Sequence, residues 1–130
     1  MESKKESFLQ DTMTCNRALA AVRDSLYVIG GKWKLPIIIT LLEGPQRFRE
    51  LQRSLEGITP KVLSKELKDL ELNAFVTRTV YDTTPVTVEY KLTGYSQTLK
   101  PVLGALKKWG EQHRDHIRAQ SKANRAKPQK

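Results

Sequence analysis

The stretch from Arg47 to Lys68, RFRELQRSLEGITPKVLSKELK, reads as two short helices separated by a Glu-Gly break at positions 56–57. Thr59 and Pro60 predict the start of the second helix. Threonine accepts a hydrogen bond from a first-turn N–H, and proline fits the first helical position because its missing N–H is not needed there. Two short helices joined by a tight turn are typical of a helix-turn-helix, which places its second helix in the DNA major groove.

The second predicted helix has two chemically different faces. At about 100° per residue, Leu63, Leu67 and Leu70 cluster on one side, which predicts a buried face. The opposite side carries Lys61, Ser64, Lys65 and Lys68. One face therefore fits a protein core and the other fits an anion. The alternative is an ordinary solvated face, since Glu66 and Asp69 dilute the positive charge at its edge.

Length and charge narrow the classes of partner. The 130 residues suit one domain with its own core, and the formal net charge of +9 favours nucleic acid, an anionic membrane surface or an acidic protein. The longest apolar run, Leu35 to Leu42, is far shorter than the roughly 20 residues of a membrane-spanning helix. The N-terminal sequence MESKKESFLQ has no apolar segment typical of a secretory signal. We therefore expect no membrane partner.

The N-terminal part of the chain divides into an arm and a helix. Residues 1–14 are polar with mixed charge and predict a flexible arm. From Cys15 onward, apolar residues recur at three- and four-residue steps, at Leu19, Val22, Leu26 and Ile29. Gly30 and Gly31 then predict the end of this helix, because glycine tolerates a positive φ.

The next predicted helix runs from about Trp33 to Glu43. It is apolar on nearly all sides, so we expect it to be the central buried helix. It contains Pro36, which a helix tolerates only in the first turn, where no intrahelical acceptor is lost. The proline therefore places the start of this helix near Lys32.

The hydrophobic period changes from helical to alternating after Asn73. Residues 75–81 are rich in β-branched and aromatic residues. Between Val86 and Leu92 apolar residues alternate with polar ones, which predicts a strand with one buried face. The cluster DTTP at positions 82–85 favours a turn. We therefore expect the two strands to form a hairpin.

A last helix follows the hairpin. Thr93 predicts its start, and its apolar residues at helical spacing are Leu99, Val102, Leu103, Leu106 and Trp109. It is expected to end near Ala119, and residues 121–130, which are polar and basic, predict a disordered tail. A hairpin directly after a helix-turn-helix is the wing of a winged-helix domain. The predicted fold is therefore mainly α with a small β-hairpin, a winged helix-turn-helix over residues 15–120.

These residues resemble the HxlR-type bacterial transcription regulators, a winged-helix group related to MarR regulators. The resemblance covers residues 15–109 and rests on the order and spacing of short motifs. These are Cys15, IGGKW at 29–33, Gly44, RFREL at 47–51, GIT at 57–59, Leu63, Leu67, LE at 70–71, VY at 80–81, Pro85 and VEYKLT at 88–93. Two positions depart from the family pattern: Asn16 replaces a frequent proline, and Ser96 a usual glycine. Neither lies on the expected DNA face.

The resemblance implies a homodimer, held by the N- and C-terminal helices, that binds an operator with two related half-sites. Independently, the last helix has an apolar stripe with little left to cover in so small a domain, so a partner chain is a natural place to bury it. We expect a sequence-specific transcriptional regulator whose partners are double-stranded operator DNA and a second copy of itself. The alternatives are a chromosome-coating or RNA-binding winged helix without sequence preference, and a winged helix that binds proteins.

The residues of the second helix expected to face DNA are Thr59, Lys61, Ser64, Lys65 and Lys68. Ser64 and Lys65 are expected to reach base edges, since lysine donates to guanine and serine is permissive. Lys61 and Lys68 are expected to hold phosphates, which position the protein without specifying sequence.

Two further groups are expected near DNA. Gln46, Arg47 and Arg49 are placed at the start of the preceding helix, where backbone N–H groups and the helix dipole favour a phosphate. The alternative for them is a solvated helix start. On the hairpin, Arg78 is the only arginine and the tip is acidic. The wing is therefore expected to touch the DNA backbone through Arg78 and a threonine at 83 or 84, adding little sequence reading.

Cys15 is the only cysteine, which excludes an internal disulfide framework and fits a reducing, cytoplasmic location. In the family that the chain resembles, some members sense quinones, aldehydes or oxidants through a cysteine at this N-terminal position. Positive charge from Lys4, Lys5 and Arg17 would favour the reactive thiolate at Cys15. The alternative is a small, half-buried residue without chemistry.

No other chemistry is indicated. His113 and His116 share a helix face, but no third ligand is evident, so no metal site is predicted. No nucleophile–base or paired-carboxylate motif indicates an enzyme, and no cofactor is expected. No group of polar residues identifies an effector.

Overall fold

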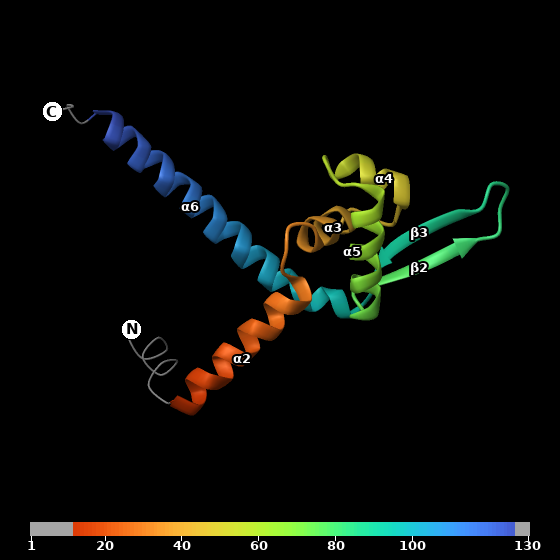
Figure 1. Ribbon diagram of the computed structural model, residues 1–130, viewed down its shortest axis with the longest axis horizontal. Helices are drawn as coiled ribbons and strands as arrows, with labels where there is room; N and C mark the ends of the chain where they lie inside the picture. The colour runs from red at the N-terminus through yellow and green to blue at the C-terminus, as the bar shows by residue number, and fades with distance from the viewer. Residues whose placement is uncertain (1–11, 127–130) are drawn as a thin grey trace. The chain divides into compact units, whose positions relative to one another are not determined.

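The computed structural model describes residues 12–126 (Figure 1). In chain order its elements are α2 (Thr12–Ile29), α3 (Lys34–Leu41), β1 (Gln46–Arg47), α4 (Phe48–Ser54), α5 (Pro60–Leu72), β2 (Val76–Tyr81), β3 (Thr87–Leu92), the 3-10 helix η1 (Tyr95–Leu99) and α6 (Lys100–Ala126). They fall into two units that divide between Gly94 and Tyr95. The first contains the helix-turn-helix and the sheet, and the second contains η1 and α6.

The helix-turn-helix consists of α4 and α5, as the sequence predicted. The turn between them passes through Gly57, whose φ of +89° favours glycine. Thr59 precedes α5, and its hydroxyl oxygen accepts a hydrogen bond from the Val62 N–H at 3.2 Å. Asn73 ends the helix, with its backbone N–H donating to the Asp69 carbonyl at 3.1 Å. Both predicted ends of this helix are confirmed.

The core of the first unit lies where α3, α4 and α5 meet the sheet. Its most completely buried side chains are Ile37, Ile38, Leu51, Leu63, Leu67, Leu70 and Val76. Three of these are the leucines of α5, so the predicted buried face of this helix is confirmed. Because these leucines recur at steps of four and three, the apolar stripe follows one side of α5.

Helix α3 is central but shorter than predicted. It begins at Lys34, two residues after the expected start at Lys32, because residues 31–33 form the bend that follows α2. Pro36 is its third residue and lies in the first turn, as expected. Its outer side is open to solvent, and the side chain of Ile39 is 52% exposed.

The sheet has three strands, in the order β1-β3-β2, and not the two strands expected. The third strand is β1, in which Gln46 pairs with Tyr90 and Arg47 pairs with Glu89. Two residues are too few for alternation to reveal a strand, which explains why the sequence did not predict it. Both flanking pairs are antiparallel, and the hairpin of β2 and β3 extends away from α3, α4 and α5 (Figure 1).

The predicted alternation of β3 holds only in part. Tyr90 is buried, and Val88 and Leu92 are half-buried, but Val86 precedes the strand and is exposed. The hydroxyl of Thr93, directly after β3, donates to the Ala74 carbonyl, which fastens the end of the strand to the start of β2.

Both terminal helices have other bounds than predicted. The last α-helix does not begin after Thr93, because the 3-10 helix η1 comes first and α6 begins at Lys100, where Pro101 fits the first turn. Helix α2 begins at Thr12, three residues before Cys15, and residues 1–11 of the expected arm lie outside the described residues. Helix α6 continues to Ala126, so residues 121–126 of the expected disordered tail are helical, and residues 127–130 are not described. The sequence SKANRA at 121–126 lacks glycine and proline and contains two alanines, so it permits continuation despite its polarity. No helix within residues 12–126 is long and apolar enough to cross a membrane.

Candidate nucleic-acid interface

The side of α5 opposite its leucines is an exposed surface with positive charge, and we call it the outer face. It consists of Lys61, Ser64, Lys65 and Lys68, all exposed, with Thr59 exposed at its N-terminal end. Side chains three and four residues apart are neighbours on a helix surface. The structure therefore brings together the five residues of α5 and its cap that the sequence singled out.

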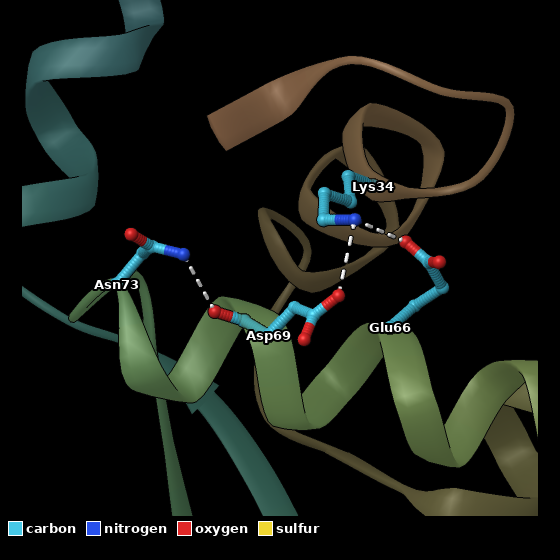
Figure 2. A network of polar contacts seen from close by, with 4 residues as sticks. All are labelled: Lys34, Glu66, Asp69 and Asn73. Atoms are coloured by element: carbon cyan, nitrogen blue, oxygen red, sulfur yellow. Dashed lines mark hydrogen bonds and ion pairs between the residues drawn. The ribbon is translucent and has the colours of Figure 1, made fainter. Parts of the chain in front are cut away.

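The two acidic residues beside this face bind a lysine from another helix (Figure 2). The Lys34 ammonium, from the first residue of α3, donates to Glu66 Oε2 at 2.8 Å and lies 3.4 Å from Asp69 Oδ2. The side chains of Lys34 and Glu66 are only 12% and 13% exposed, and that of Asp69 is 37% exposed. One ammonium thus bridges two carboxylates on successive turns of α5.

Two opposing effects act on the pKa of Lys34. Burial lowers the pKa because it disfavours the charged ammonium. The hydrogen bonds and charge interactions with Glu66, followed by those with Asp69, raise it and outweigh the burial. The pKa of Lys34 is therefore raised above the ordinary value of a lysine, and the ammonium form is favoured in the folded protein.

From the sequence, Glu66 and Asp69 were expected only to dilute the positive charge of the outer face. The structure corrects this, because both carboxylates have a cationic partner on α3. The partner was missed because Lys34 is separated from Glu66 by 32 positions in the chain. The sequence did offer one signal: Lys34 is a charged residue in the first turn of the otherwise mainly apolar helix α3, which suggests a partner for its charge.

The residues preceding α4 form a short strand that the sequence did not predict. Gln46 and Arg47 make up β1, and Arg47 is also the N-cap of α4, so it lies at the start of this helix as expected, with Gln46 immediately before it. The Arg47 backbone N–H donates to Glu50 Oε1 at 2.8 Å, and its side chain is exposed. Arg49 is exposed in the first turn of α4.

Beside α4 lies an open hollow of about 340 Å³ lined by Arg49, Gln52, Arg53 and Ile58. Two of the lining residues, Arg49 and Arg53, are arginines one helical turn apart. Another, Ile58, directly precedes Thr59, the N-cap of α5. Sequence reasoning did not single out Gln52 or Arg53. Their positions three and four residues after Arg49 are the local signal that could have identified them.

The wing is close to electrically neutral. Arg78 is exposed on β2 opposite Tyr90, but the strands also carry Glu89, which accepts a hydrogen bond from the Tyr81 hydroxyl at 3.2 Å. This hydrogen bond, together with the carboxylate charge, raises the pKa of Tyr81. In the loop, the Thr83 hydroxyl donates to the Pro85 carbonyl at 2.8 Å. The wing therefore has two exposed cations, Arg78 on β2 and Lys91 on β3, balanced by Asp82 and Glu89.

Cys15 is half-buried on α2. Arg17 follows it by two residues on the same helix, whereas Lys4 and Lys5, which were expected to act on the thiol, lie outside the described residues. The thiol is thus on a helical segment that the structure defines, outside the helix-turn-helix.

Large apolar side chains of α2 and α6 are exposed. On α2 these are Leu19, Val22, Leu26 and Tyr27, and on α6 they are Val102, Leu106, Trp109 and Ile117. No residue of α6, all of which is described, is buried. The Trp109 ring stacks on the His113 ring, with centroids 4.9 Å apart and planes 6° from parallel. The sequence predicted no metal site at the histidines and did not reveal this ring contact, although Trp109 and His113 are one helical turn apart.

The comparisons with known proteins agree with this arrangement. The HxlR-like helix-turn-helix family matches residues 28–118. YybR of Bacillus subtilis, described as an uncharacterized HTH-type transcriptional regulator, is 40% identical over 100 residues, which cover 77% of this chain and 80% of YybR. The redox regulator HypR in its reduced form has a TM-score of 0.71 at 39% identity, over 76% of this chain and 98% of HypR.

A MarR-family transcriptional regulator from Enterococcus faecalis V583 has a TM-score of 0.66 at 37% identity, over 82% of this chain and 92% of its own. The family match covers more than half of the chain, and the relatives are transcriptional regulators and not enzymes. The chain is therefore a member of the HxlR-like helix-turn-helix family of transcriptional regulators and shares its winged-helix fold with MarR-type proteins.

Proposed function

We propose that this protein binds an operator as a homodimer and reads its sequence with the outer face of α5. The observation that carries this proposal is the division of α5 into a fully buried leucine face and an exposed face with three lysines and a serine. A helix of this kind, preceded by a short helix and a tight turn, is how a helix-turn-helix presents side chains to the major groove. Binding to chromosomal DNA places the protein in the cytoplasm.

The residues of this face have separate roles in the proposal. Ser64 and Lys65, in the middle of the face, contact base edges. Lys61 and Lys68, one turn to either side, contact phosphates and position the helix, and Thr59 lies beside the backbone at the helix N-terminus. Loss of a base contact changes sequence preference, whereas loss of a phosphate contact weakens binding to all sequences.

Elements outside α5 add phosphate contacts. Arg47 and Arg49 are exposed before and at the start of α4, and Gln46 lies beside them in β1. In a helix-turn-helix the first helix crosses the DNA backbone, which places these cations near phosphates. Arg78 supplies one such contact from the wing, whose near-neutral charge gives it little part in sequence reading.

The dimer is formed by α2 and α6. Both helices expose large apolar side chains, and removing this apolar surface from water in a dimer is favourable. A two-fold dimer buries the same patch of both copies and presents two recognition helices to two related half-sites.

Cys15 makes DNA binding responsive to oxidants or electrophiles. The similarity to the redox regulator HypR and the half-buried thiol on α2 support this role. If α2 belongs to the dimer interface, modification of the thiol alters the interface and hence DNA binding. The matched control is Cys15→Ser, which leaves the chain without a thiol. Operator affinity that is unchanged after modification of Cys15, verified by mass, would exclude this role.

The experiment for the main proposal is binding to a labelled duplex from the region upstream of the protein's own gene, with excess random DNA, over a series of salt concentrations. We expect tight binding that persists in competitor and weakens steeply with salt. Binding abolished by competitor would favour the second candidate, a nucleic-acid-binding protein without sequence preference, for which the net charge of +9 is the supporting observation. Absence of binding at low salt would exclude DNA as the partner of the outer face.

A further inference from the structure

We propose that Lys34 is a positioning residue for DNA recognition: it holds Glu66 and Asp69 against α3, so that α5 presents its lysines, and not these two carboxylates, to the DNA. The inference rests on the proposed function of α5 and adds a residue that lies outside the DNA-facing set. Figure 2 shows the arrangement, with Lys34 on α3 reaching across to two successive turns of α5.

The charge of α5 shows why such a residue is needed. Between Pro60 and Leu72 the helix has three lysines, at 61, 65 and 68, and three acidic residues, at 66, 69 and 71, so its formal side-chain charge is zero. Its attraction for DNA therefore depends on where each charge points. At about 100° per residue, Asp69 lies only about 40° around the helix from Lys65, at the edge of the outer face.

Lys34 supplies a cation at that acidic edge. Its ammonium lies 2.8 Å from Glu66 Oε2 and 3.4 Å from Asp69 Oδ2, and it is nearly buried. Contacts at this distance and burial are less screened by water and salt than an exposed surface pair. The ammonium is charged at neutral pH, as in any lysine, and the two carboxylates raise its pKa further despite its burial.

The same contacts restrict the rotation of α5 about its axis. The buried leucines fix which side of α5 faces the core, although each hydrophobic contact is by itself non-directional. Two carboxylates three residues apart that share one ammonium are directional, and they are satisfied in one rotational position of the helix. Lys34 therefore reinforces the rotational position of α5 that the buried leucines already favour.

Removal of Lys34 alone leaves two carboxylates without their cation beside the DNA-facing lysines. They regain water by turning outward, where they meet DNA phosphates of like charge. We expect Lys34→Met to weaken operator binding by at least about tenfold, because like charges across an interface are strongly unfavourable. Lys34→Arg keeps a cation that can bond both carboxylates and is expected to retain binding.

The decisive variant is Lys34→Met combined with Glu66→Gln and Asp69→Asn. The triple variant has no carboxylate at these two positions that could turn toward the DNA. Its operator affinity should therefore lie within a few-fold of that of the Glu66→Gln/Asp69→Asn double variant. The matched control is Lys32→Met, which removes the same charge two residues away, from an exposed lysine whose ammonium lies over the Trp33 ring. Affinities are expressed per active molecule, by stoichiometric titration, and melting temperatures are measured for every variant.

The outcomes separate positioning from stability and from net charge. Lower melting temperature with unchanged affinity per active molecule would show a structural role only and overturn the proposal. An equal loss for Lys32→Met, or no recovery in the triple variant, would also overturn it. If Lys34→Met does not fold, the double and triple variants are compared, because neither has a carboxylate at position 66 or 69. A tenfold difference in operator affinity between these two variants would contradict the proposal. Failure of the unmodified protein to bind any duplex would instead overturn the proposed function.

Discussion

The winged-helix core and helix α6 use apolar residues in opposite ways. One side of α3, α4 and α5 and the start of β2 bury their large apolar side chains together, and Leu51, Leu63 and Leu70 have no exposed surface. Along the 27 residues of α6 none is buried, and Trp109 is 61% exposed. The first region satisfies its hydrophobic pattern within one chain. The second has apolar residues at helical spacing that are exposed to solvent, which is the physical basis for expecting a second copy.

The largest expected effect is on the core. Leu67→Ala removes a fully buried side chain of α5, and we expect the free energy of unfolding to fall by about 2–5 kcal/mol. Denaturant unfolding measured by circular dichroism tests this. Leu72→Ala is the matched control, because Leu72 is in the same helix and is largely exposed. Equal losses from the two substitutions would contradict the assignment of the buried face.

The next effect concerns α6. Leu106→Asp places a charge in the exposed apolar stripe, and we expect it to dissociate the dimer, because a buried unpaired charge is strongly unfavourable in an interface. Sedimentation velocity at several protein concentrations tests this. Gln112→Asp, on the polar side of α6, is the control. A variant that keeps the mass of a dimer at all concentrations would place the interface elsewhere.

A smaller effect separates residues within the outer face. Lys65→Ala is expected to weaken operator binding by about tenfold and to relax the preference for operator over random DNA, since a base contact is worth about 1–3 kcal/mol. Lys61→Ala is expected to weaken binding to operator and to random DNA alike. It should also reduce the slope of log binding constant against log salt concentration by about 1. Lys122→Ala, from the exposed end of α6, is the control. Identical salt and competitor profiles for the Lys65 and Lys61 variants would reject the division of roles.

The smallest effect concerns pH. Because folding raises the pKa of Lys34, its ion pairs contribute stability that is complete below the unfolded lysine pKa of about 10.4 and is lost as the pH rises through the folded pKa. The free energy of unfolding should therefore decline more steeply above about pH 10 in the unmodified protein than in Lys34→Met. Lys32→Met should decline as the unmodified protein does. Parallel curves for Lys34→Met and the unmodified protein would contradict the pairing.

Sequence patterns revealed what neighbouring residues encode. The two faces of α5 follow from residues three and four apart, and its ends follow from Thr59 and Asn73, so periodicity and capping were sufficient. The hairpin was likewise visible, because each of its strands has six residues.

Features that depend on residues far apart in the chain, or on very short elements, could not be predicted from the sequence. Strand β1 has two residues and exists because β3 lies beside it. The contacts of Lys34 with Glu66 and Asp69 join residues that no local pattern relates. The tail appeared disordered from its polarity, whereas its helix-forming residues extend α6 to Ala126.

The most direct test of the central claim is a hydroxyl-radical footprint of the protein on its own upstream region, in excess random DNA. A homodimer that reads two half-sites with two α5 helices predicts protection of two related sequences about 10 base pairs, or one helical turn, apart. Lys65→Ala should weaken protection at both half-sites equally. Uniform protection along the duplex, or a single protected site, would contradict a dimeric operator-reading regulator.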